Sequence, residues 1–397
     1  MNRQALLLGF AFAANVAAAQ APRVRPGIDV LLADSAHLIA GRRLGLITNQ
    51  TGIDAQGVAT IDRLARFPAA RLVALFAPEH GIRGTVAPGE RVHDTVDVGT
   101  GLPIYSLHGA GRARPPSPVQ LALMDVLLVD LQDVGTRPFT YSLTVVLAMQ
   151  AAAAAHVRVV VLDRPNPIGC SVQGPVLDTA YASPVGILPV PLRHGMTIGE
   201  LARFANGELH IGADLVVVPL EGWRRCMWFD ETGLPWVRPS PNLPDLESVA
   251  WYPGTVLFEG EGLTVGTNLS VGRGSDAPFR QVGAPWLDAA RIAAEMRRRY
   301  GTHLDTVTFT PRAPGDRKYD GVAVHAVRFG RFERARGDAI RDATHLLGLI
   351  AELHGDSLRV DSLLVARHLG VWPSSLTRWP EALRGFARRR VPYLLYR

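Results

Sequence analysis

Four short apolar runs follow one another in the first half of the chain, and each gives way to small or polar residues. They are LGLIT, RLVALF, DVLLVDL and VRVVVLD, at residues 44–48, 71–76, 125–131 and 157–163. Runs this short and this continuously apolar are typical of strands buried on both faces of a parallel sheet. The intervening segments 58–67 and 141–156 have the composition and spacing of helices. The alternation predicts an α/β fold built on a doubly wound parallel sheet.

A second ordered region begins after residue 248. The stretch at 228–245 is rich in proline and polar residues, and apolar patterns resume with VAWYPGTVLFEG. Two helical patterns and two strand patterns follow, at residues 287–300, 339–353, 305–310 and 321–329. With 397 residues and 47% hydrophobic content, the chain is long enough for two domains. We expect a catalytic domain at residues 25–248 and a smaller α/β domain at residues 249–397.

The first 19 residues have the pattern of a secretory signal peptide. Arg3 precedes an apolar stretch from Ala5 to Phe12, and the alanines at 17–19 resemble a cleavage site. Spanning a membrane takes roughly 20 consecutive apolar residues, and neither this stretch nor any later one is long enough. We therefore expect a periplasmic or secreted protein with no membrane span after cleavage.

Cysteine content and charge add two constraints. Cys170 and Cys226 are the only cysteines, and in an oxidising compartment they can form a disulfide or remain two thiols. The net charge of +6 comes almost entirely from arginine, because Lys318 is the only lysine. These arginines form no basic stripe with interleaved aromatic residues, so nucleic acid is not an expected partner. We interpret most of them as solvated surface.

Polar residues follow each predicted strand and also a fifth candidate strand at residues 185–192. Because the carboxyl ends of parallel strands meet at one edge of a sheet, we expect these residues to line one pocket. The five groups are Asn49 and Gln50; Glu79, His80 and Arg83; Gln132, Asp133 and Arg137; Asp163, Arg164 and Asn166; and Arg193 and His194. Such a rim can hydrogen-bond a hydroxyl-rich ligand from several directions, as a sugar requires.

Glu79 is the strongest candidate for chemistry. It directly follows an apolar run, LVALFAP, where a carboxyl group has little reason to stand unless it is paired or used. Partial burial there favours the protonated carboxyl, which is the form a general acid needs. Structural roles in Asx turns, ion pairs or contacts with carbonyl groups stay open for several others, namely Asn49, Asp133, Asp163, Asn166 and His194.

Other chemistries have less support. The sequence has no dinucleotide fingerprint, no Walker A motif and no G-x-S-x-G elbow. His80, Asp133, Asp163 and His194 are suitable ligand types for a metal, but no closely spaced signature such as H-E-x-x-H joins them. The sequence therefore predicts no cofactor.

At this point the motifs resemble a known family. TNQTG, PEHGIRG, TGLPIYSL, DLQDVGTR with Tyr141, LDRPNPIG, PLRHGMTIGELA, YPGTVLFEG and TNLSVGRG are similar to the NamZ-type exo-β-N-acetylmuramidase family. The resemblance runs in order from residue 28 to the C-terminus. It implies a Rossmann-like first domain, a smaller second domain that closes an active cleft, and release of terminal β-1,4-linked N-acetylmuramic acid from peptidoglycan fragments. It also implies that the catalytic glutamate is Glu79.

The chain departs from the family pattern at a few positions. Cys170 stands where a glycine is usual, Pro138 where an aromatic residue is usual, and Val271 where an acid is usual. An insertion lies between Gly260 and Thr267. The loss of the acid at position 271 bears on the wall that the second domain contributes to the cleft.

The mechanism has several options at this stage. Glu79 is the expected acid, and His80 is expected to orient it. The second group is Asp133, Asp163 or the substrate's own 2-acetamido oxygen, and we favour the 2-acetamido oxygen. Asn242 and Asn268 are expected to close over the sugar. An arginine is expected to bind the lactyl carboxylate, from among Arg83, Arg137, Arg164, Arg193 and Arg273. Two other classes stay open: a metal-dependent hydrolase or esterase, and a periplasmic muropeptide-binding protein without turnover. The sequence does not indicate an oligomeric state.

Overall fold

The structure is a computed structural model that describes residues 24–86, 90–109, 112–260, 266–372 and 379–397. The expected signal peptide lies outside these residues. Within the described segments, no helix has the length and apolar character that crossing a membrane requires.

A seven-stranded sheet forms the centre of the first domain, in the order β11-β8-β7-β1-β2-β4-β3. Its strands are β1 (Arg43–Thr48), β2 (Arg71–Ala77), β3 (Thr95–Val96), β4 (Pro103–Ser106), β7 (Val126–Asp130), β8 (Arg158–Leu162) and β11 (Leu215–Val218). All neighbours pair in parallel except β3 and β4. The predicted fold class and all four predicted strands are confirmed.

The strand order places a topological switch between β1 and β7. From β1 the chain proceeds to β2 and β4 on one side, and from β7 it proceeds to β8 and β11 on the other. The loops after β1 and β7 therefore diverge at the carboxyl edge, where open α/β sheets bind ligands. β2 and β7 both neighbour β1, so their backbones lie two strand spacings apart, about 9.5 Å.

The fifth candidate strand is not part of this sheet. Residues 191–193 form β10 (Pro191–Arg193), which pairs antiparallel with β9 (Gln173–Val176) in a separate ribbon. Pro189 and Pro191 lack N–H groups, so this segment cannot join the interior of a ladder. The edge next to β8 belongs to β11 instead.

Side chains on the strands alternate between two apolar clusters, one on each face of the sheet. One cluster takes Leu46, Leu128 and Val160 and packs against the first helices, α1 (Gly27–Asp34) and α2 (Thr60–Ala65). The other takes Ile47, Val129 and Val161 and packs against α4 (Tyr141–Ala154) and α5 (Ile198–Glu208). Burial on both faces explains why the strands are apolar at nearly every position.

Helix α5 begins with the expected capping box. Thr197 Oγ1 accepts from the Glu200 N–H at 3.2 Å, and Glu200 Oε2 accepts from the Thr197 N–H at 3.1 Å. The fully buried Glu200 also pairs with Arg225. Glu200 therefore has a structural role at the start of this helix.

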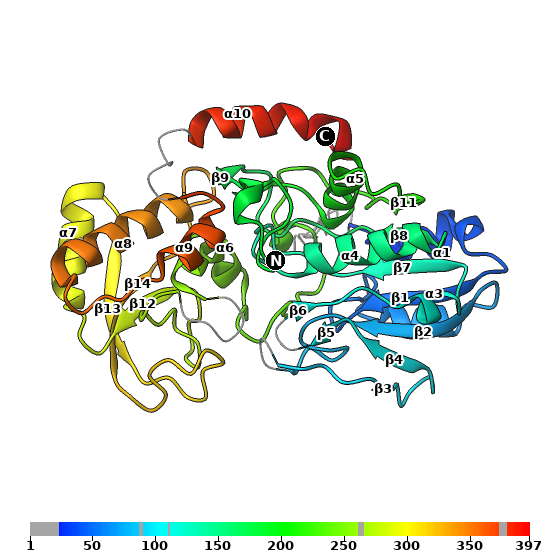
Figure 1. The fold of residues 1–397 in the computed structure, drawn as a ribbon, viewed down its shortest axis with the longest axis horizontal. Coiled ribbons are helices and arrows are strands. Elements are labelled where there is room, and N and C mark those ends of the chain that lie inside the picture. The colour runs from blue at the N-terminus through cyan, green and yellow to red at the C-terminus, as the bar shows by residue number, and fades with distance from the viewer. Residues whose placement is uncertain (1–23, 87–89, 110–111, 261–265, 373–378) are drawn as a thin grey trace, which may run out of the picture.

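The C-terminal domain lies beside the sheet and contains a three-stranded antiparallel sheet, β12-β14-β13 (Figure 1). Its strands and helices are β12 (Gln281–Ala284), β13 (Leu304–Phe309), β14 (Val324–Phe329), α6 (Leu246–Thr255), α7 (Ala289–Tyr300), α8 (Ala339–His354) and α9 (Ser362–Leu369). The cluster that covers α4 continues without a break into this domain and includes Leu269, Val282 and Leu346. The two domains therefore share one apolar core.

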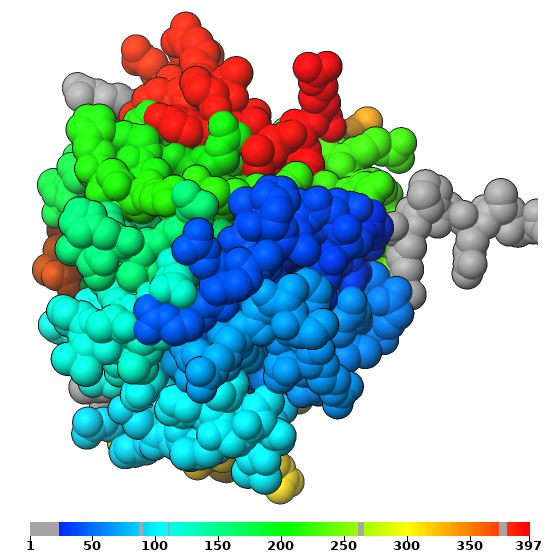
Figure 2. Space-filling model, turned by 90° about the vertical axis from the view of Figure 1, so that its right-hand side faces the viewer, coloured from blue at the N-terminus to red at the C-terminus, as the bar shows by residue number. Residues whose placement is uncertain are grey.

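The end of the chain returns to the first domain. Helix α10 (Trp379–Arg389) crosses back along the top of the molecule, and the last residues lie against the segment that contains α5 (Figures 1 and 2). Leu395 N–H donates to Glu200 at 2.7 Å, and Arg203 donates to the Tyr393 carbonyl at 3.0 Å. The remaining short elements are β5 (His108–Gly109), β6 (Arg112–Ala113) and α3 (Pro118–Leu121).

Candidate active site

Glu79 stands at the carboxyl edge of the sheet, two residues after β2. His80 and Gly81 both have positive φ angles, 70° and 75°, so the chain turns sharply as soon as Glu79 has left the strand. The Glu79 side chain is 13% exposed. Thr140, just before α4, donates from Oγ1 to Glu79 Oε2 at 2.6 Å. The acid that follows the apolar run is thus held at the rim and is largely shielded from water.

Two histidines lie near Glu79, and they differ in their contacts. His80 Nδ1 lies 2.7 Å from the Val86 carbonyl oxygen, so this ring is engaged by its own loop. His108, which begins β5, has Nε2 only 4.0 Å from Glu79 Oε1. The sequence neighbour of Glu79 is therefore turned to the loop, and a more distant histidine faces the carboxyl group.

Asp133 and His194 form a second polar pair, after β7 and β10. Asp133 Oδ2 accepts from the Gly135 N–H at 2.6 Å and lies 3.4 Å from His194 Nε2. His194 Nδ1 accepts from the Met196 N–H at 3.2 Å, which leaves the ring proton on Nε2. The side chains are 2% and 1% exposed, and Asp133 Oδ1 has no hydrogen-bond partner within the described part of the chain.

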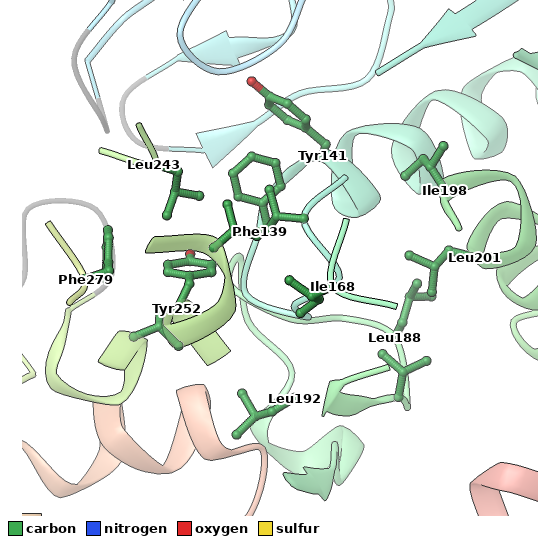
Figure 3. Packing of buried hydrophobic residues seen from close by; sticks show 14 of the residues in the cluster. Phe139, Tyr141, Ile168, Leu188, Leu192, Ile198, Leu201, Leu243, Tyr252 and Phe279 are labelled. Atoms are coloured by element: carbon green, nitrogen blue, oxygen red, sulfur yellow. The ribbon is translucent and has the colours of Figure 1, made fainter. Parts of the chain in front are cut away.

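Tyr252, on α6, connects these groups with the C-terminal domain. Burial raises the pKa of Tyr252; Arg273 lowers it, and the carboxylates of Glu259, Glu79 and Asp133 raise it. All four groups therefore act electrostatically on this phenol. Its ring packs edge-to-face against Phe279 at 4.7 Å and against Phe139 at 6.4 Å, and Phe139 in turn contacts Tyr141 at 4.6 Å (Figure 3). An aromatic row thus joins the two domains beside Glu79.

A buried charged cluster lies on the C-terminal side of Tyr252. Arg273 donates to Glu259 Oε2 from Nε and from a terminal nitrogen, at 2.9 and 2.6 Å. Lys318 donates to the carbonyl groups of Phe258 and Leu269 at 3.2 and 2.8 Å. Burial opposes ionisation of Glu259, but Arg273 and Lys318 outweigh it and lower the pKa of this carboxyl. Among the residues that the structure describes, Glu259 Oε1 has no hydrogen-bond partner.

Several predicted sugar ligands are used inside the protein. Asn49 donates to the Tyr141 hydroxyl at 2.6 Å, and this hydroxyl donates to the Pro239 carbonyl at 3.0 Å. The remaining side chains bond backbone or neighbouring groups: Gln132 to the Asp133 and Pro165 carbonyls, Arg164 to Asp130 and the Ile53 carbonyl, and Asn166 to the Met196 carbonyl. These residues shape the loops of the site.

The predicted arginines are not equivalent. Arg137 is buried and donates to the carbonyls of Pro175, Val190 and His368 at 2.6 to 3.0 Å, and burial lowers its pKa to about 9. Arg193 is buried with its guanidinium carbon 5.6 Å from the ring centres of both Trp228 and Phe332, and burial lowers its pKa to about 10. Neither belongs to the solvated surface that most arginines are expected to form. Arg83 is exposed and pairs with Asp97; Arg273 remains as the arginine beside Tyr252.

Asp163 lies fully buried under α5, away from the group around Tyr252. It accepts from Thr197 Oγ1 at 2.7 Å, from the Gly199 N–H at 2.8 Å and from the Tyr396 hydroxyl. Burial raises its pKa to about 7, although these hydrogen bonds oppose the shift. Asp163 therefore anchors the start of α5 and the end of the chain.

The predicted amide ligands also differ in their contacts. Asn268 is bound on both sides, by the Ser357 carbonyl at 2.9 Å and the Arg359 N–H at 2.8 Å. Gln50 donates to the Arg238 carbonyl at 2.8 Å. Asn242 is half-buried, and its backbone N–H bonds Ser240. Among the described residues, no three His, Cys, Asp or Glu side chains gather closely enough to hold a metal ion.

Comparison with known proteins agrees with this geometry. The model of the N-terminal domain of exo-β-N-acetylmuramidase NamZ matches residues 44–247, and that of its C-terminal domain matches residues 250–396. The chain belongs to this family. It is 42% identical over 339 residues to the peptidoglycan β-N-acetylmuramidase NamZ of Bacillus subtilis (strain 168), covering 85% of this chain and 79% of the relative.

Solved structures of the family have the same fold. Two crystal structures of DUF1343 family proteins from Bacteroides fragilis NCTC 9343 are each 32% identical to this chain, with TM-scores of 0.85 and 0.73. They cover 94% and 95% of this chain, and 99% of their own chains is matched in both cases.

The departures from the NamZ pattern have structural explanations where they are described. Cys170 is bonded to Cys226 in a disulfide that spans 56 residues of sequence. Val271 is fully buried in the shared core. Glu259 supplies a carboxylate beside Arg273. The insertion after Gly260 falls largely outside the described residues.

Sequence reasoning missed Thr140, His108, Tyr252, Glu259 and Lys318. Thr140 and His108 belong to the first domain, but neither directly follows one of the apolar runs that predicted the strands. Glu259 had a signal, because it closes the run VLFE in the same way that Glu79 closes LVALFAPE.

Proposed function

We propose that this protein is an exo-acting glycoside hydrolase that releases terminal β-1,4-linked N-acetylmuramic acid from peptidoglycan fragments, with Glu79 as the general acid. Family membership and the 42% identity to a peptidoglycan β-N-acetylmuramidase support the glycosidase activity. The observation that carries the residue assignment is the position of Glu79, which is shielded and bonded to Thr140 at the carboxyl edge of the sheet.

Asp133 is the proposed second group. A substrate with a 2-acetamido group can form its own oxazoline-type intermediate if a carboxylate holds the acetamido N–H, and inverting or retaining enzymes also need a second carboxyl group. Asp133 has a buried oxygen without a partner, and its charge acts on Tyr252 together with that of Glu79. Asp163 is bonded by Thr197, Gly199 and Tyr396 instead, which favours Asp133.

We propose Arg273 as the cation that attracts the lactyl carboxylate of muramic acid. Its guanidinium lies 5.0 Å from the centre of the Phe279 ring, next to Tyr252, and stays paired with Glu259. The Glu259 carboxylate fixes the orientation of the Arg273 guanidinium, and Lys318 adds positive charge on the same side.

We propose a periplasmic or secreted location. The N-terminal signal-peptide pattern supports it, and so does the Cys170–Cys226 disulfide, because such bonds persist in oxidising compartments.

The experiment that tests the function is product analysis with two isomeric disaccharides. We expect the wild-type protein to release N-acetylmuramic acid from a disaccharide with muramic acid at its non-reducing end. It should leave the disaccharide with N-acetylglucosamine at that end intact. Cleavage of the second disaccharide alone would contradict the substrate assignment. Tight binding of either without turnover would support the muropeptide-binding alternative.

A further inference from the structure

A buried histidine outside the proposed acid and base lies beside the Glu79 carboxyl. His108 is 3% exposed, and its Nε2 is 4.0 Å from Glu79 Oε1. Neither ring nitrogen has a hydrogen-bond partner among the described residues. A buried polar group without a partner destabilises the fold, so the position of this ring needs an explanation.

The backbone around His108 is fixed. Its N–H donates to Ser106 Oγ at 3.1 Å, and Ser106 Oγ donates to the His108 carbonyl at 2.7 Å. The Val92 N–H donates to the same carbonyl at 3.4 Å. The imidazole is therefore held against Glu79 by its own main chain, without a hydrogen bond to the ring.

Among the described residues, the charged or titratable groups that act on the imidazole are Glu79, His80 and Arg114. Burial lowers the pKa of His108, Glu79 raises it, and His80 and Arg114 lower it, with a net decrease. Arg114 is close because its guanidinium donates to Ser106 Oγ at 3.4 Å. The surroundings thus favour the uncharged imidazole.

We propose that His108 stays uncharged beside Glu79 and donates from Nε2 to the Glu79 carboxylate that forms when this acid gives up its proton. The alternative is an imidazolium–carboxylate ion pair, which burial disfavours because both charges lose water. Arg114 and His80 oppose the imidazolium further. This inference rests on the proposed function, and it makes His108 a positioning residue that acts through Glu79.

The contact between His108 and Glu79 acts after proton transfer. When Glu79 gives its proton to the leaving oxygen, the carboxylate that forms faces His108 Nε2. A movement of about 1 Å brings this nitrogen within hydrogen-bond distance, and the neutral ring with its proton on Nε2 then donates to Oε1. The proton count is unchanged: one proton leaves Glu79, and the imidazole keeps its own.

Nitrogen-15 NMR of histidine-labelled full-length protein tests the pair directly. Spectra of wild type, Glu79→Gln and His108→Gln are recorded across the pH range, with His108→Gln used for assignment. We expect His108 to be uncharged at neutral pH. We also expect a small shift of its ring resonances at the pH where the basic limb of kcat/KM falls, and no such shift in Glu79→Gln. An imidazolium at neutral pH, or the same shift in Glu79→Gln, would overturn the proposal.

Kinetics give a second readout. His108→Phe removes the donor to the carboxylate, so we expect kcat/KM to fall about tenfold and its basic limb to move to higher pH by at least about 0.5 unit. His108→Gln, whose amide can still donate, should keep the basic limb near its wild-type position. An unmoved limb in His108→Phe counts against the pair. If Glu79→Gln is inactive but His108→Phe leaves the basic limb unmoved, the pair fails while the function stands; a fully active Glu79→Gln removes the function itself.

Discussion

The hydroxyl of Tyr396 donates a hydrogen bond to Asp163, so the penultimate residue of the chain is tied to the loop after β8. The Leu220 N–H donates to the same hydroxyl at 2.9 Å, and the Tyr396 ring packs edge-to-face on Trp223 at 4.9 Å. The tail thus closes over the start of α5, on the side of the sheet domain away from the Tyr252 group. Its residues should affect stability more than chemistry.

Tyr396→Phe should therefore destabilise the fold in a pH-dependent way. Burial raises the pKa of Asp163 to about 7, so the folded state binds an extra proton between roughly pH 4 and that value, and stability falls as pH rises through this window. Removing a donor to the carboxylate should cost about 1–3 kcal/mol at roughly pH 8.5 and less at roughly pH 5.5. Denaturant unfolding at the two pH values measures the difference. An equal loss at both would contradict it.

The two aspartates proposed from the sequence should have different roles, Asp133 in the reaction and Asp163 in the stability of the fold. Asp133→Asn should lower kcat by about 100-fold or more while the thermal midpoint stays near the wild-type value, because Asp133 Oδ1 serves no structural partner. Asp163→Asn should lower the midpoint and leave the kcat of the folded fraction within about threefold. Steady-state kinetics and thermal melts of both variants measure kcat and the midpoint. A loss of kcat in Asp163→Asn with a lower midpoint in Asp133→Asn would exchange the two roles.

We expect Thr140 to support catalytic activity through its hydroxyl group. Thr140→Val removes the donor at 2.6 Å from Glu79 Oε2, so we expect kcat/KM to fall about tenfold or more and its basic limb to move to higher pH. Thr140→Ser keeps the hydroxyl and is the matched control, expected within about threefold of wild type. If Thr140→Val has the same kcat/KM and pH profile as Thr140→Ser, this hydrogen bond does not contribute to catalysis.

The disulfide should stabilise the protein without taking part in the reaction. Replacing both Cys170 and Cys226 with serine opens a loop of 56 residues, which should cost about 2–4 kcal/mol in unfolding free energy. Activity of the folded double variant should stay near wild type. Chemical denaturation with and without reductant checks both forms, and identical midpoints would contradict a stabilising bond.

The sheet and the position of Glu79 could be predicted because they depend on local pattern. Runs that are buried on both faces are apolar throughout, and the carboxyl edge of a parallel sheet follows from strand order alone. The partners of Glu79 could not be predicted in this way, since Thr140 is 61 residues away in sequence. Sequence also does not distinguish a buried arginine such as Arg137 from a solvated one, because only the folded structure shows which carbonyl groups surround it.

The central claim is that Glu79 protonates the leaving oxygen, and a leaving-group comparison of wild type with Glu79→Gln tests it most directly. The substrates are the natural disaccharide, whose leaving sugar needs a proton, and a dinitrophenyl β-N-acetylmuraminide, whose leaving group does not. We expect the variant to lose at least about 100-fold in kcat/KM on the disaccharide and much less on the activated substrate. A variant within about threefold of wild type on the disaccharide would contradict the account.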